Sequence, residues 1–171
     1  MERQKILRGI KYGLIAGLIS TIVTDVVSLI IFLVIGESLL SFFALIGQSF
    51  LTLLGVEAAY PVWQGLTLHY SIGILTGVVL GILTQKFKRL QFSSYRKGIL
   101  VSIIITQIEG NALFYLMSII MDIPQSQMVM MYALGFVLHL IWGTCLGTII
   151  AHSQHSRIPT SDYPLIAGEQ L

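Results

Sequence analysis

The sequence predicts an all-α integral membrane protein, and three observations support this fold class. Apolar residues make up 55% of the 171-residue chain and charged residues only 11%, whereas a soluble domain carries about 25% charged residues. Four apolar segments are long enough to cross a bilayer as helices. All ten Lys and Arg fall on one side of these segments, as the positive-inside rule requires. Mean hydropathy is +0.85.

The four predicted spans form a single membrane domain over residues 1–151. Each segment is too long and too continuous for the alternating strands of a barrel, so helices are expected. The spans cover about 12–35, 63–84, 98–121 and 128–151. Residues 152–171 are expected to form a polar cytoplasmic tail.

The distribution of positive charge predicts the orientation of the chain. Four basic residues precede the first span, five lie between the second and third, and one lies in the tail. The opposite side carries only Glu37, Glu57 and Asp122. Because basic loops remain in the cytoplasm, we expect a multi-pass protein of the cell (inner) membrane with both termini cytoplasmic.

The apolar segment over residues 38–56 is expected to lie on the outer face. A fifth crossing would move the basic loop of residues 86–97 to the outside, against the positive-inside rule. Gln48, Ser49 and Thr52 also interrupt the apolar run. We therefore expect an interfacial or re-entrant helix here. A fifth span is the alternative, since hydropathy alone does not separate the two.

The second and fourth spans share a pattern that predicts an internal repeat. Five identical residues recur at one offset of 70 positions, without a gap. The matched pairs are Gly65 and Gly135, Leu68 and Leu138, His69 and His139, Gly73 and Gly143, and Gly77 and Gly147. The first and third spans match more loosely. The chain is therefore expected to form two tandem hairpins, parallel repeats about an axis along the membrane normal.

Stripes of glycine predict close helix packing. Residues four apart stack on one helix face, and small residues let helix backbones approach closely in lipid. Such stripes occur on the first, second and fourth spans. The glycines expected to pack in this way are Gly13, Gly17, Gly73, Gly77, Gly143 and Gly147.

Six polar residues fall inside the predicted spans, where they are costly. A charged carboxylate at the bilayer centre costs about 2.5–3.5 kcal/mol on insertion scales. The acids and imidazoles among them are expected in one layer near the midplane, facing the bundle interior and meeting partners there. The six residues are Asp25, His69, Gln107, Glu109, Asn111 and His139.

Transport, or ion or proton conduction, is the leading functional hypothesis. Asp25 and Glu109 would exchange a cation or proton, with Gln107 and Asn111 on the same pathway. The imidazoles of the second and fourth spans would serve as relays, since imidazole titrates near neutral pH. Four short helices enclose little volume, so a homo-oligomer or a partner membrane protein is expected within the lipid bilayer.

Two other functions remain open. His69 and His139, with the two carboxylates, suit a metal ion, and two His alone would suit haem b, as in a redox carrier or enzyme. The second alternative is a non-catalytic membrane subunit whose polar contacts are structural. An enzyme is not favoured because no nucleophile motif or phosphate loop appears. The composition excludes a nucleic-acid binder.

The second half of the chain resembles the YagU-like group of small bacterial inner-membrane proteins. The shared features are a short basic cytoplasmic loop, a third span with polar residues, and a fourth span with Gly135, His139 and Trp142. The resemblance covers the second to fourth spans. It implies a topology but no assigned reaction.

Overall fold

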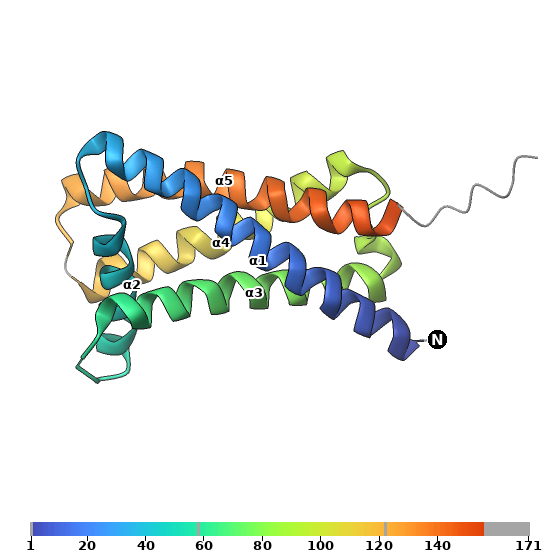
Figure 1. Cartoon of the computed structure of the whole chain (residues 1–171), viewed down its shortest axis with the longest axis horizontal. Helices are drawn as coiled ribbons and strands as arrows, with labels where there is room; N and C mark the ends of the chain where they lie inside the picture. The colour runs from blue at the N-terminus through green and yellow to red at the C-terminus, as the bar shows by residue number, and fades with distance from the viewer. Residues whose placement is uncertain (1, 58, 122, 156–171) are drawn as a thin grey trace, which may run out of the picture.

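Five α-helices and one short 3-10 turn make up the described part of the chain (Figure 1). The computed structural model describes residues 2–57, 59–121 and 123–155. No strand occurs within these ranges, so the predicted all-α class is confirmed. The elements are α1 (Glu2–Ile35), α2 (Leu39–Leu53), α3 (Pro61–Lys86), η1 (Lys88–Leu90), α4 (Tyr95–Ile120) and α5 (Gln125–His155).

Four of these helices, α1, α3, α4 and α5, are long and apolar enough to cross a membrane. The described architecture is therefore that of a membrane protein. All four helices extend beyond the predicted spans, most of all α1, which already begins at Glu2, and α5, which continues to His155. The additional residues include Lys, Arg, Gln and Leu, which are good helix formers, so the helix does not stop where the apolar run stops. Asp122 and residues 156–171 lie outside the described residues.

Short-range signals account for several helix ends. The side chain of Ser38 accepts a hydrogen bond from the Leu40 amide at the start of α2, and Ser94 accepts one from Lys97 at the start of α4. α3 begins with Pro61, which needs no amide partner in the first turn. Gly36 and Gly55 lie just before and just after α2 with φ of 76° and 69°. This left-handed conformation suits glycine because it has no Cβ.

The four long helices form two antiparallel pairs. α1 packs along α3, and α4 packs along α5. The two pairs meet through α1 and α5, whereas α3 and α4 do not pack along one another. α2 lies across one end of the bundle and packs mainly on α3 (Figure 1). The bundle is therefore closed on one side and parted on the other.

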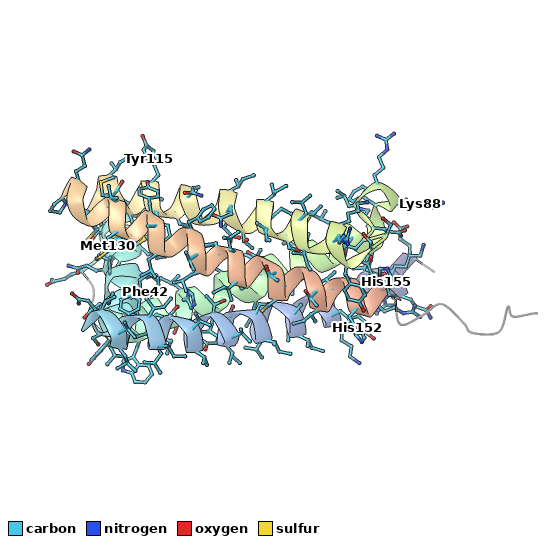
Figure 2. All side chains as sticks on the ribbon, turned by 90° about the horizontal axis from the view of Figure 1, so that it is seen from above. Phe42, Lys88, Tyr115, Met130, His152 and His155 are labelled. Carbon is cyan, nitrogen blue, oxygen red and sulfur yellow. The ribbon has the colours of Figure 1, made fainter. Side chains whose placement is uncertain are left out.

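Every Lys and Arg of the described residues belongs to the end of the bundle opposite α2. Figure 1 shows the start of α1, η1 and the end of α5 gathered there, and Figure 2 places Lys88, His152 and His155 at the same end. The Tyr95 hydroxyl lies 2.9 Å from Nδ1 of His152, and its ring stacks on His155. The turn between α3 and α4 is thus attached to the end of α5.

Backbone-to-backbone contact between glycines holds each pair together. A Cβ built on Gly13 would overlap the carbonyl of Gly77, and one on Gly17 would overlap that of Gly73. In the other pair, a Cβ on Gly147 would overlap the carbonyl of Gly98. Because these approaches leave no room for a side chain, each pair is a tight seam.

A small dry core fills the half of the bundle away from α2. The side chains that form it come from α1, α3, α5 and the segment between η1 and α4, and they are 0–3% exposed. They are Ala16, Leu80, Phe92, Leu146, Ile150 and Ala151. This half of the bundle is therefore held by apolar packing.

Candidate functional site

A cavity of about 140 Å³ lies in the half of the bundle where α2 crosses, and residues of all five α-helices line it. Most of its wall is apolar or aromatic. Phe42 of α2 contributes to the wall, and Figure 2 shows it on the inner side of the bundle. Three titratable residues share this lining: His69, Glu109 and His139. A mostly apolar cavity with a few convergent polar groups is the usual form of a ligand site.

His69 is held by an acid of the neighbouring helix. Its Nε2 lies 2.9 Å from Oδ1 of Asp25, which joins α3 to α1. The rings of Phe42 and Phe43 on α2 lie 6.3 and 5.5 Å from the imidazole, measured between centroids. Asp25 itself does not line the cavity. This contact therefore joins α3 to α1 at the edge of the site.

Glu109 is the carboxylate that the cavity contains. The hydroxyl of Thr76 donates to it, 2.7 Å from Oε1 and 3.0 Å from Oε2. This hydrogen bond bridges α3 and α4, the two helices that do not pack along one another. No Lys, Arg or His of the described residues forms an ion pair with Glu109. Among the described residues, the carboxyl group of Glu109 therefore has a neutral hydroxyl and no cationic side chain as its partner.

His139 has a different environment from His69. Its Nδ1–H donates to the carbonyl of Gly135, one turn earlier on α5, at 2.7 Å. This bond leaves Nε2 as an acceptor in the neutral ring. The imidazole lies directly over Gly110, where a Cβ would overlap its Nε2. Phe114 and Trp142 flank the ring at 5.9 and 5.8 Å between centroids.

The two helix pairs place corresponding residues in corresponding contacts. Thr21 of α1 fills the space beside Gly73, and Thr106 of α4 fills the space beside Gly143. Further along, Asp25 faces His69, whereas Gly110 faces His139. The sequence matched Asp25 loosely with Glu109, but by contact its counterpart is Gly110. In the second pair, the carboxylate of Glu109 thus lies one residue before the position that corresponds to Asp25.

Hydroxyl groups from α1 and α2 complete the wall. Each of these side chains donates to the carbonyl four residues earlier on its own helix, at 2.8–2.9 Å. Their hydrogens are therefore committed, and only oxygen lone pairs remain for another molecule. The four residues are Thr21, Thr24, Ser28 and Ser49.

Gln107 and Asn111 do not join the other predicted pathway residues. The Gln107 amide donates to the Phe136 carbonyl at 2.8 Å, and the Asn111 amide donates to the Gln107 carbonyl at 2.7 Å. Neither residue lines the cavity, and Asn111 is exposed on α4. They lie on another face of the helix because a helical turn of 3.6 residues directs neighbouring positions apart.

The geometry gives no support to a metal or haem centre at the two histidines. Within the described ranges, no group of three or more His, Cys, Asp and Glu side chains is arranged to hold a metal ion. Nε2 of His69 is engaged with Asp25, and Nε2 of His139 faces the backbone of Gly110. Two-histidine haem ligation needs a free nitrogen on each ring and room for the macrocycle between them.

Three features of the site were not anticipated from the sequence. Thr76 lies two turns after His69, on the same face of α3, so helical periodicity is the signal that would have found it. Gly110 resembled any other small residue of a span. Trp142 lines the cavity, and its Nε1–H is buried without a partner among the described residues.

The contacts around the cavity are thus the basis on which a function is assigned. The resemblance to the YagU-like group implied a topology, and it remains a prediction. Comparison of the chain with protein-family models, curated proteins and solved structures finds no significant match.

Proposed function

We propose that this protein is a small transporter, in which Glu109 binds and releases a cation or proton within the membrane. The observation that carries the proposal is the cavity itself. A carboxylate without an ion-pair partner among the described residues lies in a mostly apolar wall, where its hydrogen bond to Thr76 bridges two helices that do not pack along one another. Keeping such a carboxylate charged in low dielectric is costly, so a bound cation or proton would stabilise it.

The orientation follows from the basic end of the bundle. By the positive-inside rule that end is cytoplasmic, so α2 lies on the outer side, as an interfacial or re-entrant helix. The cavity would then open outward beneath α2. The dry core and the glycine seams close the cytoplasmic half. A protein arranged in this way holds an outward-facing or occluded state of a carrier.

We further propose that the two helix pairs are repeats of one hairpin. The corresponding contacts of Thr21 with Gly73 and of Thr106 with Gly143 support this symmetry. Rocking of one pair against the other would alternate access, as in carriers built from repeats. The parted side between α3 and α4 is where such motion meets the least packing. A homo-oligomer, or a complex with another membrane protein, would complete the enclosure.

The alternative functions lead to different roles for the same residues. A metal or haem protein would need His69 released from Asp25. A non-catalytic subunit would use Glu109 and Thr76 only to join α3 to α4, because polar pairs of this kind also stabilise membrane bundles.

Proton flux in liposomes tests the proposal. The full-length protein is reconstituted in phosphatidylethanolamine and phosphatidylglycerol vesicles that contain a pH-sensitive dye, and a potassium diffusion potential drives proton entry. The unmodified protein is expected to acidify the vesicles faster than protein-free vesicles do. Glu109→Gln should remove most of this difference, because the amide has nearly the same shape but does not exchange a proton.

Glu57→Gln is the matched control. It is the same chemical change at an exposed position next to α2, away from the cavity, so its flux should equal that of the unmodified protein. Flux that persists in Glu109→Gln would contradict the proposal. If that variant lost only thermal stability, the structural role of the carboxylate would be the better explanation.

A further inference from the structure

We infer that the cavity takes a small organic ammonium ion, about the size of benzene, as its ligand. This inference rests on the proposed transport function for its biological role. The ligand class, however, follows from the chemistry of the wall and from the volume of the cavity.

The polar groups of the wall are nearly all hydrogen-bond acceptors. Glu109 provides a carboxylate, whereas His139 adds no free donor, because its Nδ1–H is committed to Gly135 and its Nε2 lies against Gly110. The four hydroxyls of α1 and α2 have each donated their hydrogen to a carbonyl. Among the described residues, no Lys or Arg lines the cavity, and one lining side chain, Trp142, has a neutral donor, Nε1–H, that is buried without a partner. A ligand that matches this wall brings N–H donors and a positive charge.

The other side chains of the wall are apolar, and they favour a ligand with an apolar hydrocarbon portion. Phe42, Phe50, Phe114 and Trp142 all line the cavity. Aromatic faces attract cations, and this attraction grows when the site excludes water. Aliphatic groups of the ligand would meanwhile contact Leu138 and its apolar neighbours. A metal ion or a fully hydrated cation would not use these surfaces, whereas an alkylammonium ion would.

The volume limits the size of the ligand. An internal cavity of about 150 Å³ lined by apolar residues accommodates benzene, and the cavity here measures about 140 Å³. Cyclopentylammonium has as many non-hydrogen atoms as benzene. Cyclopentanol is a neutral ligand with the same number of non-hydrogen atoms, so this pair separates charge from size, and cyclopentanecarboxylate provides a somewhat larger anionic ligand.

Tryptophan fluorescence of the full chain in detergent measures binding. The chain has two tryptophans, and Trp63 is 69% exposed, so a Trp63→Phe background leaves Trp142 as the reporter in the cavity wall. Cyclopentylammonium should change its emission with a Kd at least about tenfold lower than that of cyclopentanol, since hydrogen bonds to charged groups are roughly twice as strong as neutral ones. Cyclopentanecarboxylate should bind more weakly than either.

Two variants locate the interaction. Glu109→Gln should weaken cyclopentylammonium binding by about ten- to a hundredfold and leave cyclopentanol binding within about threefold, because only the ammonium uses the negative charge. Glu57→Gln is the control and should change neither. With Trp63 retained, Trp142→Phe should abolish the fluorescence change, since Trp63 does not line this cavity.

The outcomes distinguish this inference from the proposed function. Equal affinity for the ammonium and the alcohol would overturn the ligand class, even in a protein that conducts protons in vesicles. Selective ammonium binding without proton flux would support the ligand class and overturn proton transport. If Glu109→Gln does not give monodisperse protein, the comparison of the three ligands decides: a preference for the alcohol or carboxylate rejects the inference, and a preference for the ammonium supports it.

Discussion

The two helix pairs have similar glycine packing, but their histidines have different hydrogen-bond partners. In the α1–α3 pair, His69 meets the carboxylate of Asp25 at 2.9 Å. In the α4–α5 pair, Gly110 takes the place of that acid, and His139 bonds to the backbone of its own helix instead. The second pair keeps a carboxylate, but Glu109 reaches across to Thr76 of the first pair.

This difference separates a structural pair of residues from a reactive one. An acid and an imidazole in direct contact satisfy each other and hold two helices together. Glu109, by contrast, has a neutral hydroxyl as its hydrogen-bond partner and no ion-pair partner among the described residues. We therefore expect substitutions in the first pair to affect mainly stability, and those around Glu109 to affect mainly function.

Substitution in the glycine seams should have the largest effect, and a similar one in both pairs. Gly77→Leu would drive a side chain into the backbone of Gly13, and Gly147→Leu into that of Gly98. Overpacking of this kind costs typically 1–3 kcal/mol and occasionally more; against backbone that does not give way, we expect about 3 kcal/mol. Thermal unfolding monitored by circular dichroism in detergent would show it. A seam that tolerates leucine in only one pair would break the correspondence between them.

The coupling energies of the two histidines should differ between the pairs, and this effect should be of intermediate size. A double-mutant cycle with Asp25→Ala and His69→Ala should give a coupling energy of about 1–2 kcal/mol, near the upper range for polar pairs in membranes. The cycle of Glu109→Ala with His139→Ala should give less than about 0.5 kcal/mol, because no bond joins these side chains. Unfolding free energies from steric trapping measure both cycles. Equal coupling in the two would refute the distinction drawn above.

α2 packs mainly on the first pair, and substitution of the glycines at its ends should have a smaller effect on stability. Gly55 ends α2 with φ of 69° and nothing within 4 Å of a built Cβ, so Gly55→Ala would meet backbone strain and no clash. The expected loss is about 1 kcal/mol in unfolding free energy. Gly36→Ala, at the other end of α2, should behave alike. Losses above about 3 kcal/mol would mean that α2 contributes more to the bundle than its position indicates.

The smallest effect is expected at two buried serines, one in each pair. The hydroxyls of Ser20 and Ser102 are buried without a hydrogen-bond partner among the described residues. Replacing either by alanine removes an unsatisfied polar group, so stability should stay the same or rise by up to about 1 kcal/mol. A clear loss at only one of them would reveal an unequal polar contact. The same thermal unfolding assay detects it.

Some features of the fold could be predicted because they depend on local properties of the chain. Four long apolar helices follow from the continuity of the apolar runs, and the short α2 follows from the polar residues that interrupt its segment. The structure confirms the helical class and these four helices. Helix ends were less accurate, since α1 begins about ten residues before the apolar run, where good helix formers continue the pattern.

The candidate site could be predicted only in part. Helical spacing places His69 and Thr76 on one face of α3, and three of the four predicted acids and imidazoles do line one cavity. Gln107, however, bonds to the backbone of α5, Asn111 bonds to the backbone of α4, and neither lines the cavity. Hydropathy measures how apolar a segment is, but it does not encode the rotation of a helix about its axis.

By itself, the sequence determined that the chain forms apolar helices, that its positive charge gathers at one end, and that glycines stripe three of its helices. These properties depend on composition and on spacing along one helix. Only the tertiary structure decided that Asp25 pairs with His69, that Gly110 lies beneath His139, and that α3 and α4 part around Glu109. The physical reason is that contacts between helices depend on their relative rotation and register, which packing of the whole bundle sets.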